Sequence, residues 1–366
     1  MRDMKLKINS IVLFSVFLLS FKAALFPSIY FKVPSVLEIL IELLAYSIIV
    51  YSIMKKKKNI KELLIFVVVG LICLITAITS KSMVLFSSFL LFYVSVDNDE
   101  KKIIRIIYRT VFVVLSIHFF LFILDYAKGN ASAMQDVYGR TRYSIGFNHP
   151  NRAGFLALWC YLGYCYADSK KMYSKVIAFI PLFIIYKYTD CRSIFLVSIL
   201  YLILCCFSKN KKNKDFISKI PLILFIIVFC ITIFAVWDYW FNGKFGTLLD
   251  KISNQRIYYS YRALRIYGPT LLGREINTRI SIYGINEFDW LVLDNLYTYC
   301  IYGFGIVHLL FLTFIAYGIS KLNNIEKSKI FICWIVYAFF ELSNMNFIIS
   351  FAPILGASYL GWCGKK

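Results

Sequence analysis

The clearest structural signal lies in residues 220–241, which read IPLILFIIVFCITIFAVWDYWF. The first charged residue in this stretch is Asp238, and a helix of about 20 apolar residues is long enough to cross the hydrocarbon core of a bilayer. Comparable runs recur along all 366 residues, and 60% of the chain is apolar, whereas a soluble chain is about half apolar. We therefore expect an all-α polytopic membrane protein.

The apolar runs predict about 12 transmembrane helices. Their predicted bounds are residues 8–26, 35–54, 63–79, 82–96, 110–126, 152–167, 173–188, 194–208, 220–241, 296–319, 330–346 and 347–362. No long polar stretch remains for a separate domain, so residues 1–366 are predicted to form a single integral membrane domain. The first run has the basic start of a signal peptide, but because many spans follow, we interpret it as an uncleaved helix.

The basic residues orient these helices. The net charge is +21, but the basic side chains punctuate the apolar runs, which argues against a nucleic-acid partner. Most of the 41 Lys and Arg residues fall in both tails and in one alternate set of loops, at Lys55 to Lys58, Lys101, Lys170, Lys209 to Lys214 and Lys321. Short basic loops stay inside the cell, so this set and both termini are predicted to lie on the cytoplasmic side of the cell membrane.

The opposite, non-cytoplasmic face has two larger loops, residues 127–151 and 242–295, and loops of this length usually carry function. The second has apolar residues at helical spacings and is predicted to be partly helical and interfacial. This face also holds nine arginines: Arg140, Arg142, Arg152, Arg192, Arg256, Arg262, Arg265, Arg274 and Arg279. Because the guanidinium fork suits phosphate and carboxylate, they indicate an anionic ligand. Alternatively, they pair with acidic residues of the second loop, Asp250, Glu275, Glu287 and Asp289.

The first large loop ends in residues 142–151, which read RYSIGFNHPN. Asn148 or Asn151 can cap the helix that follows, and Pro150 suits its first turn. Capping does not account for His149, whose imidazole would lie beside the positive end of the helix dipole. An imidazole in that position tends to stay neutral and can accept a proton, so His149 is a candidate catalytic residue.

Other candidates flank the later spans. Arg192 lies in a short turn, where it either pairs with Asp190 or meets a phosphate at the membrane surface. Asp294 and Asn295 open the predicted span 296–319, where helix capping is the alternative to function. Glu341 falls inside a predicted span, where a carboxylate costs about 2.5–3.5 kcal/mol, and it is a functional candidate for that reason.

Together these motifs resemble the Wzy-type polysaccharide repeat-unit polymerases, within the O-antigen ligase and polymerase superfamily. The resemblance covers roughly residues 140–306, and it lies in the order of the motifs along the chain and their shared predicted face. The matching positions are residues 142–151, Arg192 with Ser193, residues 256–263, Leu272 with Gly273, residues 294–297, Gly303 and Gly305.

The resemblance implies a glycosyltransferase of capsule or exopolysaccharide synthesis that joins oligosaccharide units carried on undecaprenyl pyrophosphate. A hydroxyl of one unit attacks the anomeric carbon of the growing chain, and undecaprenyl pyrophosphate leaves. No metal, nucleotide or other cofactor is implied. The implied partners are the lipid-linked oligosaccharides and membrane lipids, with a flippase and a chain-length regulator as further partners.

The resemblance also implies roles for individual residues. Arg192 and Arg256, with Arg142, would hold the pyrophosphate. His149 would act as the base or orient the acceptor hydroxyl, and Asp294 is the rival base. Further contacts to the pyrophosphate or glycan are expected from Asn151, Arg262 and Asn295. Arg152 departs from the expected pattern, which leaves its role open.

Two other functions are compatible with the sequence. A ligase of the same superfamily would transfer the finished glycan to a different acceptor. A flippase for lipid-linked oligosaccharides would line a central cavity with charges and have short loops, whereas the spans here are nearly free of charge and the outer loops are long.

Overall fold

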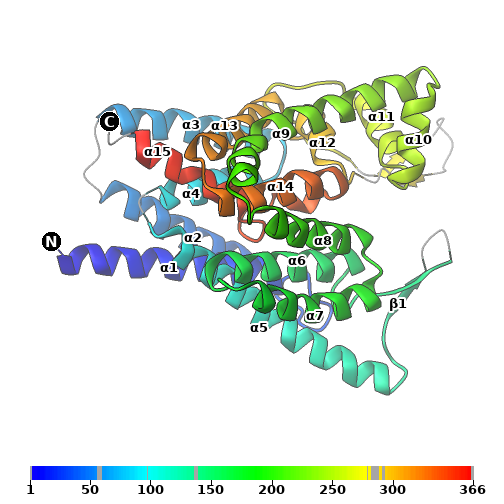
Figure 1. Cartoon of the computed structure of the whole chain (residues 1–366), viewed down its shortest axis with the longest axis horizontal. Helices are drawn as coiled ribbons and strands as arrows, with labels where there is room; N and C mark the ends of the chain where they lie inside the picture. The colour runs from blue at the N-terminus through cyan, green and yellow to red at the C-terminus, as the bar shows by residue number, and fades with distance from the viewer. Residues whose placement is uncertain are drawn as a thin grey trace. The chain divides into compact units, whose positions relative to one another are not determined.

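The computed structural model describes residues 2–55, 60–96, 98–135, 139–277, 279–281, 288–290 and 293–363 (Figure 1). Within these residues it contains fifteen α-helices, two short 3-10 helices and two two-stranded antiparallel sheets. The chain forms two compact units. Unit 1 comprises residues 1–57, 90–214 and 347–366, and unit 2 comprises residues 58–89 and 215–346.

Unit 1 is a layer of helices with α5 and α6 at its centre. Its elements are α1 (Arg2–Leu25), α2 (Ser35–Met54), α5 (Glu100–Ala127), β1 (Ala133–Gln135), β2 (Thr141–Tyr143), α6 (Pro150–Ala167), α7 (Met172–Thr189), α8 (Arg192–Phe207), η2 (Ala352–Gly356) and α15 (Ala357–Cys363). Helix α5 packs against α1 and α6, and α6 also packs against α7 and α8. Nearly every side chain of α6 is buried, as expected for a helix that is apolar on all sides.

A backbone contact fixes the point at which α6 begins. The loop after α1 runs antiparallel to the loop before α6, with a bridge between Ser28 and Phe147 and hydrogen bonds from Asn148 N to Pro27 O (3.0 Å) and from Ile29 N to Gly146 O (2.9 Å). Gly146 has φ +77°, and a Cβ there would collide with the Tyr30 ring. Only glycine allows this approach, so the loop that carries His149 is held in place.

Unit 2 is built around the short helix α12. Its elements are α3 (Ile60–Thr79), α10 (Lys244–Ile252), α11 (Arg256–Tyr267), β3 (Arg279–Ser281), β4 (Phe288–Trp290), α12 (Leu296–Tyr302), α13 (Ile306–Leu322), α14 (Ile325–Phe340) and η1 (Leu342–Met345), with most of α9 (Lys211–Trp240). Helix α4 (Val84–Ser95) is shared between the two units. Helix α12 packs against α11, α13 and α14.

The two large loops contain regular structure. Strands β1 and β2 form a hairpin within residues 127–151. The prediction that residues 242–295 are partly helical is confirmed by α10 and α11. Asp250 anchors the start of α11, because its Oδ1 accepts a hydrogen bond from Tyr258 N at 2.7 Å. The interfacial placement of these helices stays a prediction.

Three of the predicted spans are wrong in their extent. Residues 296–319 are broken into α12 and α13 at Gly303 to Gly305. The helix predicted at 330–346 ends at Phe340, because Glu341 is extended (φ −144°). Residues 347–362 form no continuous helix and contain only η2 and most of the short α15.

Among the residues that the structure describes, four helices are long and apolar enough to cross a membrane by length and composition: α2, Glu62–Thr79 of α3, α5 and Lys212–Trp240 of α9. Shorter apolar helices are Ser10–Leu25, α4, α8 and α13. Large apolar side chains lie exposed on these helices, among them Ile39, Leu64, Phe120 and Ile223. Soluble monomers rarely expose apolar surface on this scale, so the chain is a membrane protein. Lys56 to Lys58, Lys365 and Lys366, which helped to set the predicted orientation, lie outside the described residues.

Candidate functional site

In unit 1, three arginines gather at the turn between α7 and α8. We call Arg140, Arg142, Arg192 and Asp190 the arginine cluster. Arg140 Nη1 forms an ion pair with Asp190 Oδ2 at 2.8 Å, and Arg192 Nε lies 3.8 Å from Asp190 Oδ1. With three guanidinium groups and one carboxylate, the cluster has a formal charge of +2.

Arg142 joins the β1–β2 hairpin to the helix ends. Its Nε donates to the carbonyl of Thr189 at 2.8 Å, and its Nη2 donates to Asn151 Oδ1 at 2.5 Å. The Thr189 carbonyl belongs to the last turn of α7, where carbonyls lack helical partners and the helix dipole favours a cation. A guanidinium has five N–H donors, and these two bonds use two of them, which leaves donors for a ligand.

Arg192 is the most accessible member of the arginine cluster. Its side chain is 64% exposed, and its distance to Asp190 exceeds that of a hydrogen bond. An exposed ion pair of this kind contributes at most about 1 kcal/mol. The Arg192 fork can therefore turn to an anion with little loss of stability.

His149 is the N-cap of α6, a role that the sequence assigned to Asn148 or Asn151. Its Nδ1 accepts a hydrogen bond from Asn151 N at 3.1 Å. A ring nitrogen that accepts must be unprotonated, so this bond assigns the proton of the neutral ring to Nε2. The ring can donate through Nε2, while proton uptake at Nδ1 would break the cap.

The neighbouring Arg152, whose role the sequence left open, holds helices together. Its Nη2 donates to the carbonyl of Ala23 on α1, and its guanidinium stacks on the Phe155 ring at 5.4 Å. These contacts explain the departure from the expected pattern as a packing feature of unit 1.

In unit 2, two carboxylates meet one guanidinium. We call Asp294 and Glu341 the carboxylate pair. Arg256 Nη2 lies 3.4 Å from Asp294 Oδ2 and 3.6 Å from Glu341 Oε1. The side chains are 12% exposed for Arg256, 31% for Asp294 and 6% for Glu341. Asp294 is thus the carboxylate that a ligand can reach more easily.

The ends of three helices bring this cluster together. Arg256 is the first residue of α11. Its Nε donates to the carbonyl of Phe340 (2.8 Å), which has no helical partner because it lies at the end of α14. Its Nη1 donates to Ser253 O (2.7 Å). Asn295 caps α12 through Thr298 N at 3.2 Å, as the capping alternative expected, and its Nδ2 donates to Phe339 O at 3.2 Å. Asp294 precedes that cap and so has a fixed position.

The environment of Arg256 differs from that of an open anion site. Its Nε and both Nη atoms are engaged by two carbonyls and two carboxylates, and the three charged side chains carry a formal charge of −1. Arg262, also expected to contact ligand, lies over the Tyr258 ring at 5.4 Å on α11.

The acidic residues of the second loop, offered as alternative partners for the arginines, are engaged elsewhere where the structure describes them. Glu275 forms an ion pair with Lys81 at 2.6 Å, and Asp250 holds α11. Burial raises the pKa of Asp250 despite the backbone hydrogen bonds that it accepts. Glu287 and the side chain of Asp289 lie outside the described residues.

The structure sorts the predicted site residues into two groups. Unit 1 holds Arg142, Asn151, Arg192 and His149, and unit 2 holds Arg256, Arg262, Asp294 and Asn295. The sequence did not single out Arg140, and it did not pair Glu341 with Arg256. The signal for Arg140 was its position two residues before Arg142, directly before β2. Comparison with known protein families, with curated proteins and with solved structures gives no match.

Proposed function

We propose that this membrane protein is a polysaccharide polymerase that joins oligosaccharide repeat units carried on undecaprenyl pyrophosphate. The observation that carries the proposal is the arginine cluster, a positively charged site at the ends of apolar helices with one widely exposed guanidinium. A lipid-linked pyrophosphate presents its anion at that kind of place, where an apolar helix ends. The motif order of the Wzy-type polymerases supports the same function.

The arginine cluster would bind the pyrophosphate leaving group. Charge-assisted hydrogen bonds contribute about 1.5–3 kcal/mol each, and they act most strongly on the charge that develops as the pyrophosphate departs. His149 would donate from Nε2 to the phosphate or glycan, since its Nδ1 is used by the helix cap. Arg192 and Arg142 keep the role that the sequence suggested for them.

We assign the base to Asp294 and the positioning of that carboxylate to Arg256. Asp294 would take the proton of the acceptor hydroxyl while the oxygen of that hydroxyl bonds to the anomeric carbon. The bond from that carbon to the pyrophosphate oxygen breaks, and undecaprenyl pyrophosphate carries away the electron pair. Arg256 is enclosed by protein oxygens and so suits positioning better than pyrophosphate binding. The two clusters belong to different units, and each assignment is tested separately.

The proposal includes the predicted arrangement in the membrane. About 12 crossings would place both clusters on the non-cytoplasmic face, with both termini in the cytoplasm. Both clusters lie at helix ends, and both adjoin the two loops predicted to be outside.

The first test is the surface polysaccharide of a strain lacking this gene, complemented with wild type, Arg192→Ala, Arg192→Lys or Arg265→Ala. Loss of one charge-assisted donor pair predicts about 10- to 100-fold less polymer for Arg192→Ala. Arg192→Lys should recover only part of the activity, because Lys lacks the fork. Arg265→Ala is the matched control, since Arg265 is exposed on the same predicted face and donates to Tyr261 Oη (3.3 Å).

The same gel separates the rival functions. A polymerase deletion leaves single lipid-linked units outside the membrane and no ladder. Units trapped on the cytoplasmic side would indicate a flippase, and an intact but unattached ladder would indicate a ligase. Full-length polymer from Arg192→Ala at normal protein level would rule out the proposed pyrophosphate site.

A second test addresses the base. Asp294→Asn keeps the size and hydrogen-bonding ability of the side chain but cannot take a proton at neutral pH. Loss of a general base lowers the rate by about 10²- to 10⁴-fold. The control combines Asp294→Asn with Asn151→Asp. The second substitution adds a carboxylate in unit 1 and should not restore polymerisation. Normal polymerisation by Asp294→Asn would exclude Asp294 as the base.

A further inference from the structure

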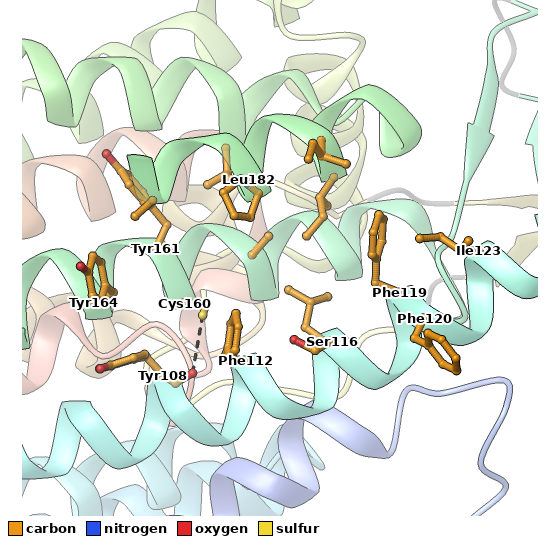
Figure 2. Close-up of a pocket in the computed structure, with 16 residues that line it drawn as sticks. Tyr108, Phe112, Ser116, Phe119, Phe120, Ile123, Cys160, Tyr161, Tyr164 and Leu182 are labelled. Carbon is orange, nitrogen blue, oxygen red and sulfur yellow. Dashed lines mark hydrogen bonds between the residues drawn. The ribbon is translucent and has the colours of Figure 1, made fainter. Parts of the chain in front are cut away.

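A cavity of about 550 Å³ lies among α5, α6 and α7 in unit 1 (Figure 2). This is a volume typical of small-molecule sites, which range over about 300–1,000 Å³. Figure 2 shows Tyr108 and Tyr164 toward one end of the cavity and Phe120 and Ile123 toward the other. The cavity therefore runs along the helices and has the elongated form of a groove.

The wall of the groove is almost wholly apolar. Aromatic rings line it from α5 and α6, including Phe112, Phe119 and Tyr161. Small residues, Ser116, Ala157 and Ala178, leave space between them. Pro181 lies inside α7 and also lines the groove, and a proline there has no N–H to bond the carbonyl of residue 177.

The groove leads toward the arginine cluster. Ile185 lines it on α7, and its carbonyl accepts a bond from Thr189 Oγ1 (2.9 Å), the residue whose own carbonyl holds Arg142. Phe119 lines the groove on α5, and its ring lies 6.2 Å from that of Tyr188. Tyr188 in turn contacts Tyr143, the neighbour of Arg142, with ring centroids 6.2 Å apart. The apolar groove and the arginine cluster thus lie close together within unit 1.

We propose that this groove holds the isoprenoid chain of the polyprenyl pyrophosphate whose head group lies at the arginine cluster. A long apolar groove with a site of formal charge +2 near one end complements a molecule with a hydrocarbon chain and a multiply charged phosphate end. Phospholipids share this chemistry in part, and the assignment of the isoprenoid chain rests on the proposed function. The groove opens on helices that carry exposed apolar side chains, so the chain would enter from the bilayer.

The test uses the purified full-length protein in vesicles of neutral lipid and a farnesyl phosphate with a diazirine in its chain. After irradiation, the labelled peptides are identified by mass spectrometry. We expect label on α5 to α7, displaced by excess undecaprenyl phosphate and not by phosphatidic acid. Equal displacement by phosphatidic acid would show a general lipid site and overturn the assignment.

Variants connect the label to the groove. Ser116→Trp, from α5, or Ala178→Trp, from α7, should fill the space and lower labelling at least about fivefold. Val113→Trp is the matched control, because Val113 is on α5, is 56% exposed and does not line the groove. Two filled variants guard against a folding defect in one of them. Labelling unchanged in both would refute the proposal.

The outcome is distinguishable from failure of the proposed function, because no glycan is present in the labelling experiment. If the protein binds the isoprenoid probe in the groove but makes no polymer, the groove assignment stands and the polymerase assignment is wrong. If the protein polymerises normally with the groove filled, the groove assignment is wrong and the polymerase assignment stands.

Discussion

Glu341 was a candidate from the sequence because a carboxylate within an apolar run is costly. The structure places it at the end of α14, 6% exposed, against Arg256. A buried carboxylate persists where a cation and hydrogen bonds compensate its lost hydration. At the residue scale Arg256 therefore contributes to the stability of unit 2, whatever its part in the proposed function.

Arg256→Gln should lower the thermal stability of the purified protein by about 3 kcal/mol, because it leaves two carboxylates without their cation. Arg256→Gln combined with Glu341→Gln should recover part of the loss. The measurement is thermal unfolding in detergent, with Arg265→Gln as an exposed control. A loss no greater than that of the control would mean that the carboxylate pair does not depend on Arg256.

Asp168, at the end of α6, makes the stability of unit 1 depend on pH. Burial acts to raise its pKa, but hydrogen bonds from Tyr108 and Arg105 and the charges of Arg105 and Arg109 outweigh burial and hold the pKa below its ordinary value of 3.8. The ionised form is favoured in the folded state, so its stabilisation is present above the ordinary value and is lost as the pH falls through the native pKa.

Asp168→Asn should therefore be less stable than wild type near neutral pH, by about 1 kcal/mol for partly exposed ion pairs. The difference should shrink as the pH is lowered below about 4, where the Asp168 carboxyl of the unfolded chain takes up a proton, and disappear below the lower native pKa. Unfolding midpoints of both proteins across this pH range measure it. A difference that stays constant with pH would show that the charge of Asp168 contributes nothing.

At the scale of elements, the break between α12 and α13 is the largest difference from the predicted spans. Thr270 N donates to Ile301 O (2.9 Å) and Ile306 N donates to Thr270 O (3.0 Å), so the segment after α11 pairs with the broken helix. Gly305 has φ +91°, and a Cβ there would collide with Leu271 O. Gly305 thus permits a close backbone contact that a side chain would prevent.

Gly305→Ala should destabilise unit 2 through both backbone strain and this collision. Gly129→Ala is the control, because Gly129 also has a positive φ (+73°) but has nothing within 4 Å of an added Cβ. Strain alone costs about 1–3 kcal/mol, so Gly305→Ala should lower the unfolding midpoint clearly more than Gly129→Ala. Equal effects in the two variants would show that the backbone contact is dispensable.

At the scale of the whole molecule, the two units interleave along the chain. Each draws on segments that are distant in sequence, and the apolar runs give no sign of which run joins which unit. The predicted single membrane domain was based on the absence of a long polar stretch, and the chain passes between the units at residues 57–58 and 214–215, within two short Lys-rich stretches of the sequence. The division arises from which helices pack together.

The predicted orientation can be checked with two lysines that are both exposed, Lys128 and Lys209. In a background with Cys206, Cys230 and Cys363 replaced by Ser, Lys128→Cys should react with a membrane-impermeant maleimide in intact spheroplasts. Lys209→Cys should react only after permeabilisation, because its loop is predicted to be cytoplasmic. The reverse pattern would invert the topology and place the first large loop inside the cell.

The sequence by itself determined the membrane class and the existence of the helices up to residue 241, although α5 and α9 begin about ten residues earlier than predicted. These features depend on local composition, since a long apolar run satisfies its own backbone hydrogen bonds in a bilayer as a helix. Only the tertiary structure decided where α12 stops, that His149 caps a helix through Nδ1, and that Arg256 faces two carboxylates. The end of α12 and the environment of Arg256 depend on contacts between distant segments, 85 residues apart for Arg256 and Glu341, and such contacts leave no local pattern. The cap is local, but the sequence offers His149, Asn148 and Asn151 for it, and only the structure shows which side chain accepts the hydrogen bond.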